Sequence, residues 1–501
     1  MTEQGAPTLG RRALLAGTAA LVAGTATGCW PSDDPPSRSD RPPTRAQEAA
    51  IFDLSFVHDS RYRPFALLAD GFATVEPGEV SALERADDSP VAPFCALEAD
   101  LDAPDRKVVL GLATEDGDRV VTTYDPEAGR VGIEVRANGR TTTVRRRTVD
   151  LPASFTLGFA LCENRVTVLA DTGDGWQPLL TERDKVRALV DLRVPETLGA
   201  HRYAWGLRGT SGGRGLARVR HGLFGMTGLR DQHLVQHEDG TPYVRDGKAY
   251  FTATCAGLGF FQQAHWGVFT LDLAQPERLE QVAQLYFRRD GLLLGDHAGQ
   301  LLRSGDRWIV ATSSWGDFDP ERGVHVRHTV TDADVLSGVL VLETERTALP
   351  TEVSSWDPGV TRIDGRWHVS FVESPSQDPF DFHPALAAGP TGASRWDEGL
   401  ELVGAATDLH QCEGPILAEV QGTWWFLASD GDARHYPVFD LSMRRVGRLD
   451  APYETNIPHP QLVPREDGSR IIVTFDGTQY AEDVMGYGGH GDVLIMRERD
   501  A

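Results

Sequence analysis

Residues 356–371, WDPGVTRIDGRWHVSF, contain the pattern that decides the fold. An Asp-Pro step precedes a run of alternating apolar and polar residues, an Asp-Gly pair follows, and a second strand-like run closes the stretch. Alternation indicates strands with one buried face, and Asp-Gly between two such runs is a strong signal for a tight β-hairpin. The stretch therefore predicts a hairpin with a carboxylate at the head of its first strand.

The same unit occurs five times in the second half of the chain. In each copy a polar residue stands eight or nine positions before a turn glycine, and an apolar or aromatic run follows the glycine. The polar residues are Asp239, Asp296, Asp357, Glu413 and His459, and the glycines are Gly247, Gly305, Gly365, Gly422 and Gly468. Such repeats are typical of the four-stranded blades of a propeller. We therefore predict a five-bladed β-propeller over residues 226–501.

The repeat also predicts a site. The first strand of each propeller blade lines the central channel, so the five polar residues are expected at one mouth of that channel. Four of the five are acids, and acids gathered in a cavity raise one another's pKa, a cost tolerated mainly where they perform chemistry. Two carboxyl groups that face a cleft can hydrolyse a glycosidic bond, because one protonates the leaving oxygen while the other activates water.

The first half of the folded chain, residues 49–225, contains strands and turns with hardly a helical period. Residues 107–146 alternate apolar with polar positions and break at Asp-Gly and Asn-Gly, which are hairpin signals. Short alternating strands at this spacing predict a two-sheet β-sandwich or jelly roll, similar in architecture to a concanavalin-type lectin. The predicted fold class is therefore all-β, a sandwich followed by a propeller.

The first 29 residues resemble an export signal. A twin-arginine pair, Arg11 and Arg12, precedes a short apolar stretch that ends in ATGC at Cys29. The stretch is short for a membrane span, and ATGC resembles a bacterial lipobox with Cys29 as the lipidated residue; a plain cleaved signal is the alternative. Residues 30–48 are rich in Pro, Ser and charge, which predicts a linker. We expect an extracytoplasmic protein that touches the membrane only through a lipid anchor at Cys29.

Composition narrows the class of partner. The net charge of -24 is spread along the chain, which argues against nucleic acid, because phosphate binding needs a concentrated basic face. Beyond Cys29 the chain has Cys95, Cys162, Cys255 and Cys412. An exported protein permits disulfides, and one pair in each half is compatible with this count, but the sequence does not fix the pairing. Nothing in the sequence indicates the oligomeric state.

The order of Asp, then DP, then EGP on blades one, three and four resembles glycoside hydrolase family 43 and its clan of arabinan- and xylan-degrading enzymes, over about residues 230–500. The resemblance implies that Asp239 is the general base, that Asp357 orients and tunes the acid, and that Glu413 is the general acid of an inverting enzyme. It implies a carbohydrate substrate that contains arabinose or xylose. It requires no cofactor, and it allows a structural calcium ion near His459.

Two features of the sequence differ from the pattern of this family. Blade one reads EDGTPYV where the family has Asp-Pro, and LRDQHLV just upstream offers Asp231 as a rival base. Asp239 is preferred because its distance from Gly247 equals the distance from Asp357 to Gly365. The sandwich also precedes the propeller, whereas accessory sandwiches of the family commonly follow it.

Further residues are expected to bind the sugar. Sugar rings stack on indoles, so three tryptophans near channel-side strand ends are candidates for this contact. The Asp-His pair at the head of blade two and the histidine at the head of blade five are further candidates for binding the sugar. These residues are Trp266, Trp315, Trp356, Asp296, His297 and His459. Two other functions remain open, a non-catalytic surface protein that binds glycans and a retaining propeller enzyme of the fructan-cleaving kind.

The export signal can be tested by itself. Replacing Arg11 and Arg12 by Lys is expected to leave the precursor in the cytoplasm, because the twin arginines are what the export route recognises. Cell fractionation and immunoblotting measure the outcome. The Cys29→Ala variant is the matched control: it should still be exported but leave the membrane fraction or stall in processing, and unchanged export of the double Lys variant would refute the twin-arginine interpretation.

Overall fold

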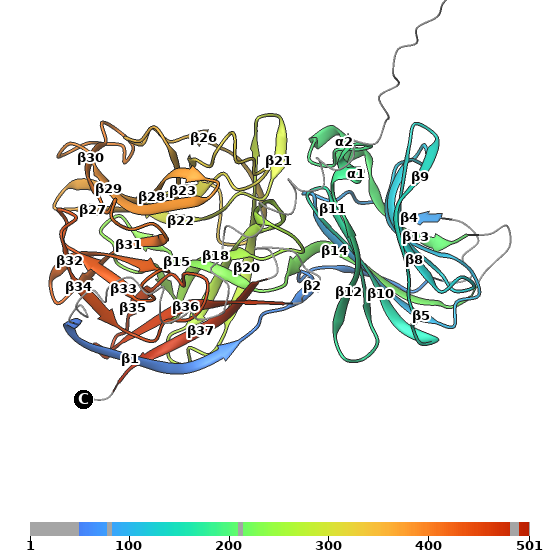
Figure 1. Ribbon diagram of the computed structural model, residues 1–501, viewed down its shortest axis with the longest axis horizontal. Coiled ribbons are helices and arrows are strands. Elements are labelled where there is room, and N and C mark those ends of the chain that lie inside the picture. Colours follow the sequence, from blue (N-terminus) through green and yellow to red (C-terminus); the bar gives the residue numbers. More distant parts are fainter. Residues whose placement is uncertain (1–49, 78–82, 209–213, 481–489, 500–501) are drawn as a thin grey trace, which may run out of the picture.

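The computed structural model describes residues 50–77, 83–208, 214–480 and 490–499, so the predicted signal and linker lie outside the described residues. The all-β fold class is confirmed. Helical structure in these ranges is confined to α1 (Asp184–Arg187), α2 (Pro195–Ala200) and the 3-10 turn η1 (Phe261–Gln263). No helix among the described residues has the length and apolar character needed to cross a membrane. The strands form two bodies side by side (Figure 1).

The first body has two antiparallel sheets. The seven-stranded sheet contains β2 (Ala66–Leu68), β3 (Ala73–Val75), β5 (Phe94–Asp102), β10 (Ser154–Cys162), β11 (Arg165–Asp171), β12 (Trp176–Glu182) and β14 (Leu216–Met226). The six-stranded sheet contains β4 (Leu83–Arg85), β6 (Val108–Ala113), β7 (Arg119–Asp125), β8 (Arg130–Ala137), β9 (Arg140–Thr148) and β13 (Arg202–Leu207). The sheet orders are β12-β11-β10-β5-β14-β2, with β3 beside β14, and β4-β13-β6-β7-β8-β9.

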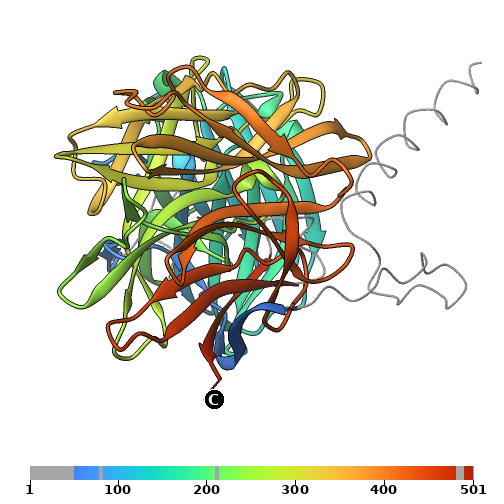
Figure 2. The same cartoon turned by 90° about the vertical axis from the view of Figure 1, so that its left-hand side faces the viewer.

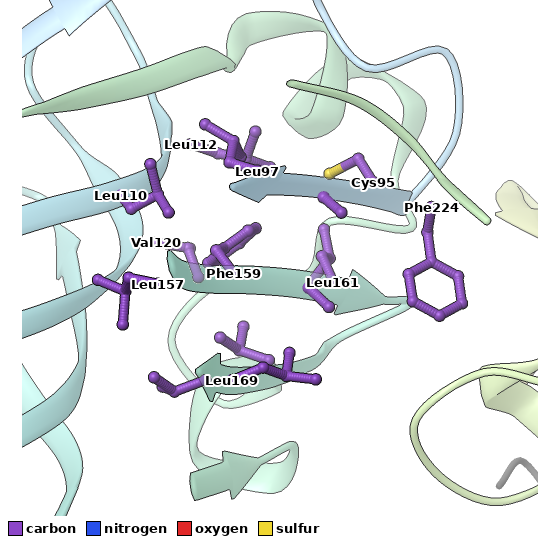
Figure 3. Close-up of a cluster of buried hydrophobic side chains, with 14 of the residues drawn as sticks. Cys95, Leu97, Leu110, Leu112, Val120, Leu157, Phe159, Leu161, Leu169 and Phe224 are labelled. Carbon is purple, nitrogen blue, oxygen red and sulfur yellow. The ribbon is translucent and has the colours of Figure 1, made fainter. Parts of the chain in front are cut away.

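One hydrophobic core lies between these two sheets (Figure 3). Leu157 and Phe159 of β10 share it with Leu110 of β6, and all three side chains are fully buried. Each such burial contributes about 1.5 to 3 kcal/mol of hydrophobic free energy. This two-layer arrangement agrees with the predicted all-β class, whereas the likeness to a concanavalin-type lectin stays a prediction.

The cysteines of the described ranges are free and buried. Cys95 and Cys162 lie in the core of the first body, on the paired strands β5 and β10, and burial raises the pKa of both thiols. Cys255 and Cys412 lie in different sheets of the second body. The pairing of one disulfide in each half, which the cysteine count allowed, is therefore absent from the described residues.

The second body begins with three sheets. The first contains β15 (Leu229–Leu234), β17 (Val244–Arg245), β18 (Lys248–Cys255), β19 (His265–Asp272), β20 (Leu279–Arg289), β21 (Leu292–Leu294) and β25 (Gly338–Glu343). The second contains β16 (Gln236–His237), β22 (His297–Ser304), β23 (Arg307–Ser313), β24 (Val326–Thr331) and β26 (Glu345–Arg346). The third contains β27 (Ser354–Ile363), β28 (Arg366–Gln377), β29 (Phe380–Ala388) and β30 (Glu401–Ala405).

An eight-stranded sheet completes this body. Its strands, in spatial order, are β31 (Cys412–Val420), β32 (Thr423–Asp430), β33 (Tyr436–Phe439), β34 (Arg445–Asp450), β1 (Ala50–Tyr62), β37 (His490–Glu498), β36 (Arg470–Gln479) and β35 (Gln461–Pro464). The predicted fourth and fifth blades are thus joined in one sheet, and the described residues do not form a closed ring of five separate blades.

The five predicted turns are confirmed. All five turn glycines have φ between 58° and 86°, a left-handed conformation that glycine adopts without steric cost, and a strand follows each of them. The inner strands lie next to one another in the order β15, β22, β27 and β31. The sheets that they head therefore curl around a common centre, consistent with a propeller-like arrangement (Figure 2).

Strand β1 changes the predicted domain boundary. It precedes the first body in sequence, yet it pairs in parallel with β34 and antiparallel with β37. The boundary that assigned residues 49–225 to the first body is therefore wrong at its start. The first body is an insertion between β1 and β15, since the chain leaves the second body after β1 and returns to it at β15 (Figure 1).

The strand β1 offers a test of this insertion. Phe56 is 2% exposed and packs in one cluster with residues of the eight-stranded sheet. Phe56→Ala is expected to lower the free energy of unfolding of the protein by about 3 to 5 kcal/mol, because it removes a large buried side chain and leaves a cavity. Chemical denaturation measures the change. The exposed neighbour Asp59 is the matched control, and an equally small effect of both substitutions would contradict the pairing of β1.

Candidate active site

Four inner strands of the second body share one backbone irregularity. In β15, β22, β27 and β31 the pairing with the next strand slips by a β-bulge near the start of the strand. The residues at the slip, Asp231, Ala298, Asp357 and Gly414, have φ of 51°, 56°, 51° and 63°. A bulge re-aims the side chain that it carries, and Asp tolerates positive φ better than most residues. Asp231 is therefore the structural counterpart of Asp357.

Three carboxylates meet at these strand ends. The Nε2 atom of His459 lies 3.8 Å from Oδ1 of Asp231, 3.6 Å from Oδ2 of Asp357 and 3.8 Å from Oε1 of Glu413. Asp231, Asp357 and His459 are buried, and Glu413 is half-buried. These distances are longer than hydrogen bonds, so the imidazole acts on the three acids mainly through its charge.

Burial and charge shift the proton affinities of this cluster. Burial, together with the negative charges of Glu413 and Asp231, raises the pKa of Asp357, and the nearby His459 only partly offsets it. Burial alone would lower the pKa of His459, but the carboxylates outweigh it and raise that pKa to about 9. A second cation, the fully buried Arg230, has its Nε atom 3.8 Å from Oδ1 of Asp231. The arrangement favours a charged imidazole and disfavours the ionised form of Asp357.

Aromatic side chains wall the pocket that contains the acids. Its lining comprises Asp231, Phe261, Ala298, Trp315, Trp356, Asp357, Phe380, Phe382, Glu413 and Ile457. The indole Nε1 of Trp356 donates a hydrogen bond to Oε2 of Glu413 over 3.2 Å. The cavity itself is small, with about 40 Å³ of free volume. It is narrower than typical ligand pockets of about 300 to 1,000 Å³, so a sugar ring has to displace some of the aromatic rings.

The structure does not bring Asp239 to this pocket. Asp239 is exposed, it accepts hydrogen bonds from the backbone and the hydroxyl of Thr241, and it lines a different cavity beside Trp424. The preference for Asp239 over Asp231 as the general base is therefore wrong, because Asp231 and not Asp239 lies in the acid pocket. The chain makes an additional excursion between β15 and β17. The position eight residues before Gly247 therefore lies in this excursion and not at the head of the inner strand β15.

The other candidate residues divide into two groups. Trp315 and Trp356 line the pocket, and His459 lies beside its acids. The binding of a sugar by these three residues stays a prediction. Trp266 does not: it is fully buried in the core between the first two sheets. Its position inside β19 explains this, because the whole strand is packed on both faces.

The blade-two pair also lies outside the pocket lining. Both oxygens of Asp296 bind the guanidinium of Arg289, over 2.7 and 2.9 Å, so this acid holds a structural ion pair. His297 is fully buried, and its ring approaches the Thr254 hydroxyl at 3.2 Å and the Phe261 carbonyl at 3.0 Å. The direct substrate contacts predicted for these two residues are therefore not supported by their positions.

The sequence prediction missed four apolar members of the pocket wall. Phe261, Phe380, Phe382 and Ile457 come from turns and strand ends, where no periodic pattern marks a residue as buried. Two phenylalanines in the hairpin tip PFDF, residues 379–382, were an available signal, because large apolar residues in a loop usually cover something.

The acids and the histidine also form a set that can hold a metal ion. Ligand atoms of Asp357, Glu413 and His459 lie within 4.8 Å of one another. Two carboxylates and one imidazole suit transition metals, whereas calcium takes about six to eight oxygen ligands. The calcium ion near His459 stays a prediction, and these three residues alone fit it poorly.

Comparisons with known proteins find similarity in structure alone. No protein-family profile matches the sequence, and no curated protein matches it significantly. A GH43_1 enzyme from Xanthomonas citri is 15% identical, covers 52% of this chain and 86% of its own, and has a TM-score of 0.36. A family 117 glycoside hydrolase from Zobellia galactanivorans is 10% identical over 54% and 84%, with a TM-score of 0.38. An α-L-arabinanase from Penicillium chrysogenum is 10% identical over 85% and 98%, with a TM-score of 0.33.

These solved structures are glycoside hydrolases, but the identities and TM-scores are too low for an argument about chemistry. The function of this pocket has to be judged from its own residues.

The charge of His459 gives a pH-dependent prediction. A histidine with a raised pKa stabilises the folded state fully below its unfolded pKa of about 6.5, and this contribution is lost as the pH rises through about 9. We expect His459→Gln to lower the free energy of unfolding at pH 6 and to approach the wild type at pH 10. Denaturant titrations with a metal chelator measure this difference. His410, an exposed histidine, is the control, and a loss from His459→Gln that is equal at both pH values would contradict the charge argument.

Proposed function

We propose that this protein is a glycoside hydrolase. The observation that supports the proposal is the convergence of three carboxylates, from three inner strands, at one aromatic-walled pocket. Hydrolysis of a glycosidic bond uses a pair of such acids, and aromatic rings bind the apolar faces of sugars.

The roles follow from position. Asp231 and Glu413 each lie 3.8 Å from the same nitrogen, so the two oxygens concerned are separated by at most twice that distance. Catalytic pairs in glycosidases are about 5 to 9.5 Å apart, and this upper limit lies inside that range. We assign the general base to Asp231 and the general acid to Glu413. Burial and acidic neighbours raise the pKa of Asp357, which lowers the negative charge of the cluster. Its Oδ2 accepts a hydrogen bond from the backbone nitrogen of Gly414 over 3.1 Å, so we assign it the role of orienting the adjacent Glu413.

The finer features of the proposal come from the sequence. The DP and EGP motifs resemble enzymes that invert the anomeric centre, and they favour glycans that contain arabinose or xylose. The twin arginines and the lipobox-like end at Cys29 support a location outside the cytoplasm with a lipid anchor. A polysaccharide-degrading enzyme would meet its substrate there.

A second candidate function is glycan binding without hydrolysis. The narrow cavity favours it, because a pocket of about 40 Å³ does not admit a glycosidic bond unless its walls move. A protein that only adheres to a glycan has no need to bring a scissile bond to the acids. The two candidates share the carbohydrate ligand and differ in turnover.

Two substitutions in the pocket test hydrolysis. Glu413→Gln and Asp231→Asn are each expected to lower kcat on arabinoxylan and arabinan by about 100-fold to 10,000-fold, the usual contribution of a general acid or base. The loss from Glu413→Gln should shrink on aryl glycosides with good leaving groups, which need little protonation. The loss from Asp231→Asn should stay the same on both, because water activation is needed in each case. Asp239→Asn is the matched control and should retain wild-type rates.

Each other outcome has a definite meaning. Loss of activity in Asp239→Asn with full activity in Asp231→Asn would overturn the structural assignment of the base. Binding of a polysaccharide by the wild type, measured by affinity electrophoresis, without release of reducing sugar would establish the glycan-binding function instead. The anomer first released, observed by NMR, separates inversion from retention.

A further inference from the structure

The loop between β23 and β24 carries two aromatic side chains at the wall of the acid pocket. It carries Trp315, whose ring centroid lies 4.4 Å from that of Phe261 and 5.3 Å from that of Trp356. It also carries Phe318, whose ring lies 5.2 Å from Phe261 and 6.3 Å from Phe380. Trp315 lines the acid pocket, and Phe318 packs against Phe261 and Phe380, which also line it. The position of the loop therefore affects the aromatic wall of the pocket.

One anchor of the loop comes from its own body. The backbone nitrogen of Gly316 donates to Oδ1 of Asp296 over 2.9 Å, and Nη2 of Arg289 donates to the carbonyl of Gly316 over 2.6 Å. The ion pair of Asp296 and Arg289 is almost completely buried. This anchor explains why an acid stands at the head of the second inner strand without reaching the pocket.

A second anchor comes from the first body. Arg193, in the turn before α2, donates through Nη1 to Oδ1 of Asp317 in the loop. The backbone nitrogen of Asp317 in turn donates to Oε1 of Glu163 over 3.2 Å. Glu163 lies in the turn between β10 and β11, so Arg193 and Glu163 both belong to the inserted body. Within the loop itself, Nη2 of Arg322 donates to Oδ2 of Asp317 over 2.9 Å.

Arg193 is itself fixed rigidly. Its Nε and Nη2 atoms bind Oδ1 and Oδ2 of Asp191 over 2.9 and 2.8 Å, and Asn164 donates to the same carboxylate over 2.8 Å. The side chain of Arg193 is 3% exposed and that of Asp317 is 7% exposed. A planar guanidinium that bridges two carboxylates in a dry environment has little freedom, so it transmits its position to the loop.

We propose that Arg193 is a positioning residue through which the first body sets the aromatic wall of the acid pocket. The inserted body is thus part of the site's support rather than an independent appendage. The contacts by themselves support the fixing of the loop by Arg193, whereas the effect of this on hydrolysis rests on the proposed function.

Hydrogen exchange of the loop tests the contact. Arg193→Met removes the charge and keeps the length of the side chain, and it is expected to speed exchange at least tenfold in a peptide spanning residues 314–323. A peptide spanning 356–371 should exchange as in the wild type. Arg187→Met is the matched control, because Arg187 is exposed and reaches the same Asp317 only at 3.6 Å. Arg193→Lys should restore protection in part.

Kinetics on xylan- and arabinan-derived oligosaccharides test the consequence. We expect Arg193→Met to change KM at least fivefold while kcat on a small aryl glycoside stays within twofold, which a general loss of structure would not produce. Should Arg193→Met fail to fold, Asp317→Asn, which alters the same contact from the loop side, takes its place in both measurements.

The possible results are distinguishable. Unchanged exchange in residues 314–323 would overturn the inference. Faster exchange with unchanged KM would show that the loop is held by Arg193 but does not set the opening, which also contradicts the proposal. Faster exchange in a protein whose wild type hydrolyses no glycan would sink the proposed function and leave the positioning role of Arg193 intact.

Discussion

The burial of neighbouring carboxylates is the constraint on which the second body depends. Each acid loses hydration when it enters the pocket, and the three negative charges repel one another. His459 sits at a similar distance from all three and supplies the opposite charge, and Arg230 adds another beside Asp231. The raised pKa of Asp357 reduces the repulsion further, because its ionised form is disfavoured. The inner strands have to end at the same place for this compensation to work, so the arrangement of the sheets and the chemistry of the cluster support each other.

The connectivity shows how that arrangement is held. Strand β1 joins the last two predicted blades into one sheet before the chain forms the first body. Residues of β1, at the start of the described chain, thereby hold the sheet formed by its last strands. In sequence, the first body lies between β1 and β15, which both belong to the second body. An insertion tied at both ends is kept close to its host, which allows buried ion pairs such as that of Arg193 and Asp317 to form between them.

Acids near the heads of neighbouring inner strands serve different purposes. The head of the third inner strand places Asp357 in the pocket, whereas Asp296 at the head of the second binds Arg289 and the backbone of Gly316. The second acid therefore contributes to the site indirectly, through the loop that carries Trp315. The two anchors of that loop, one from each body, make the shape of the pocket a property of the whole molecule.

Much of the fold is determined by local sequence signals. Alternating residues and turn glycines specify hairpins because strand faces and positive φ are decided within a few residues, and all five predicted turns are present. The motifs at Asp357 and Glu413 also identified two members of the acid cluster. The retained alternative of Asp231 shows the limit of this reasoning: its distance from Gly247 is lengthened by an excursion that no count along the chain detects.

Only the tertiary structure decided the rest. The pairing of β1 with β34 and β37, the aromatic wall, and the contact of Arg193 with Asp317 join segments that are far apart in sequence. Such contacts depend on where whole sheets lie relative to one another. That placement results from the summed packing of many buried side chains and the compensation of buried charges, and neither is encoded in any short stretch of residues.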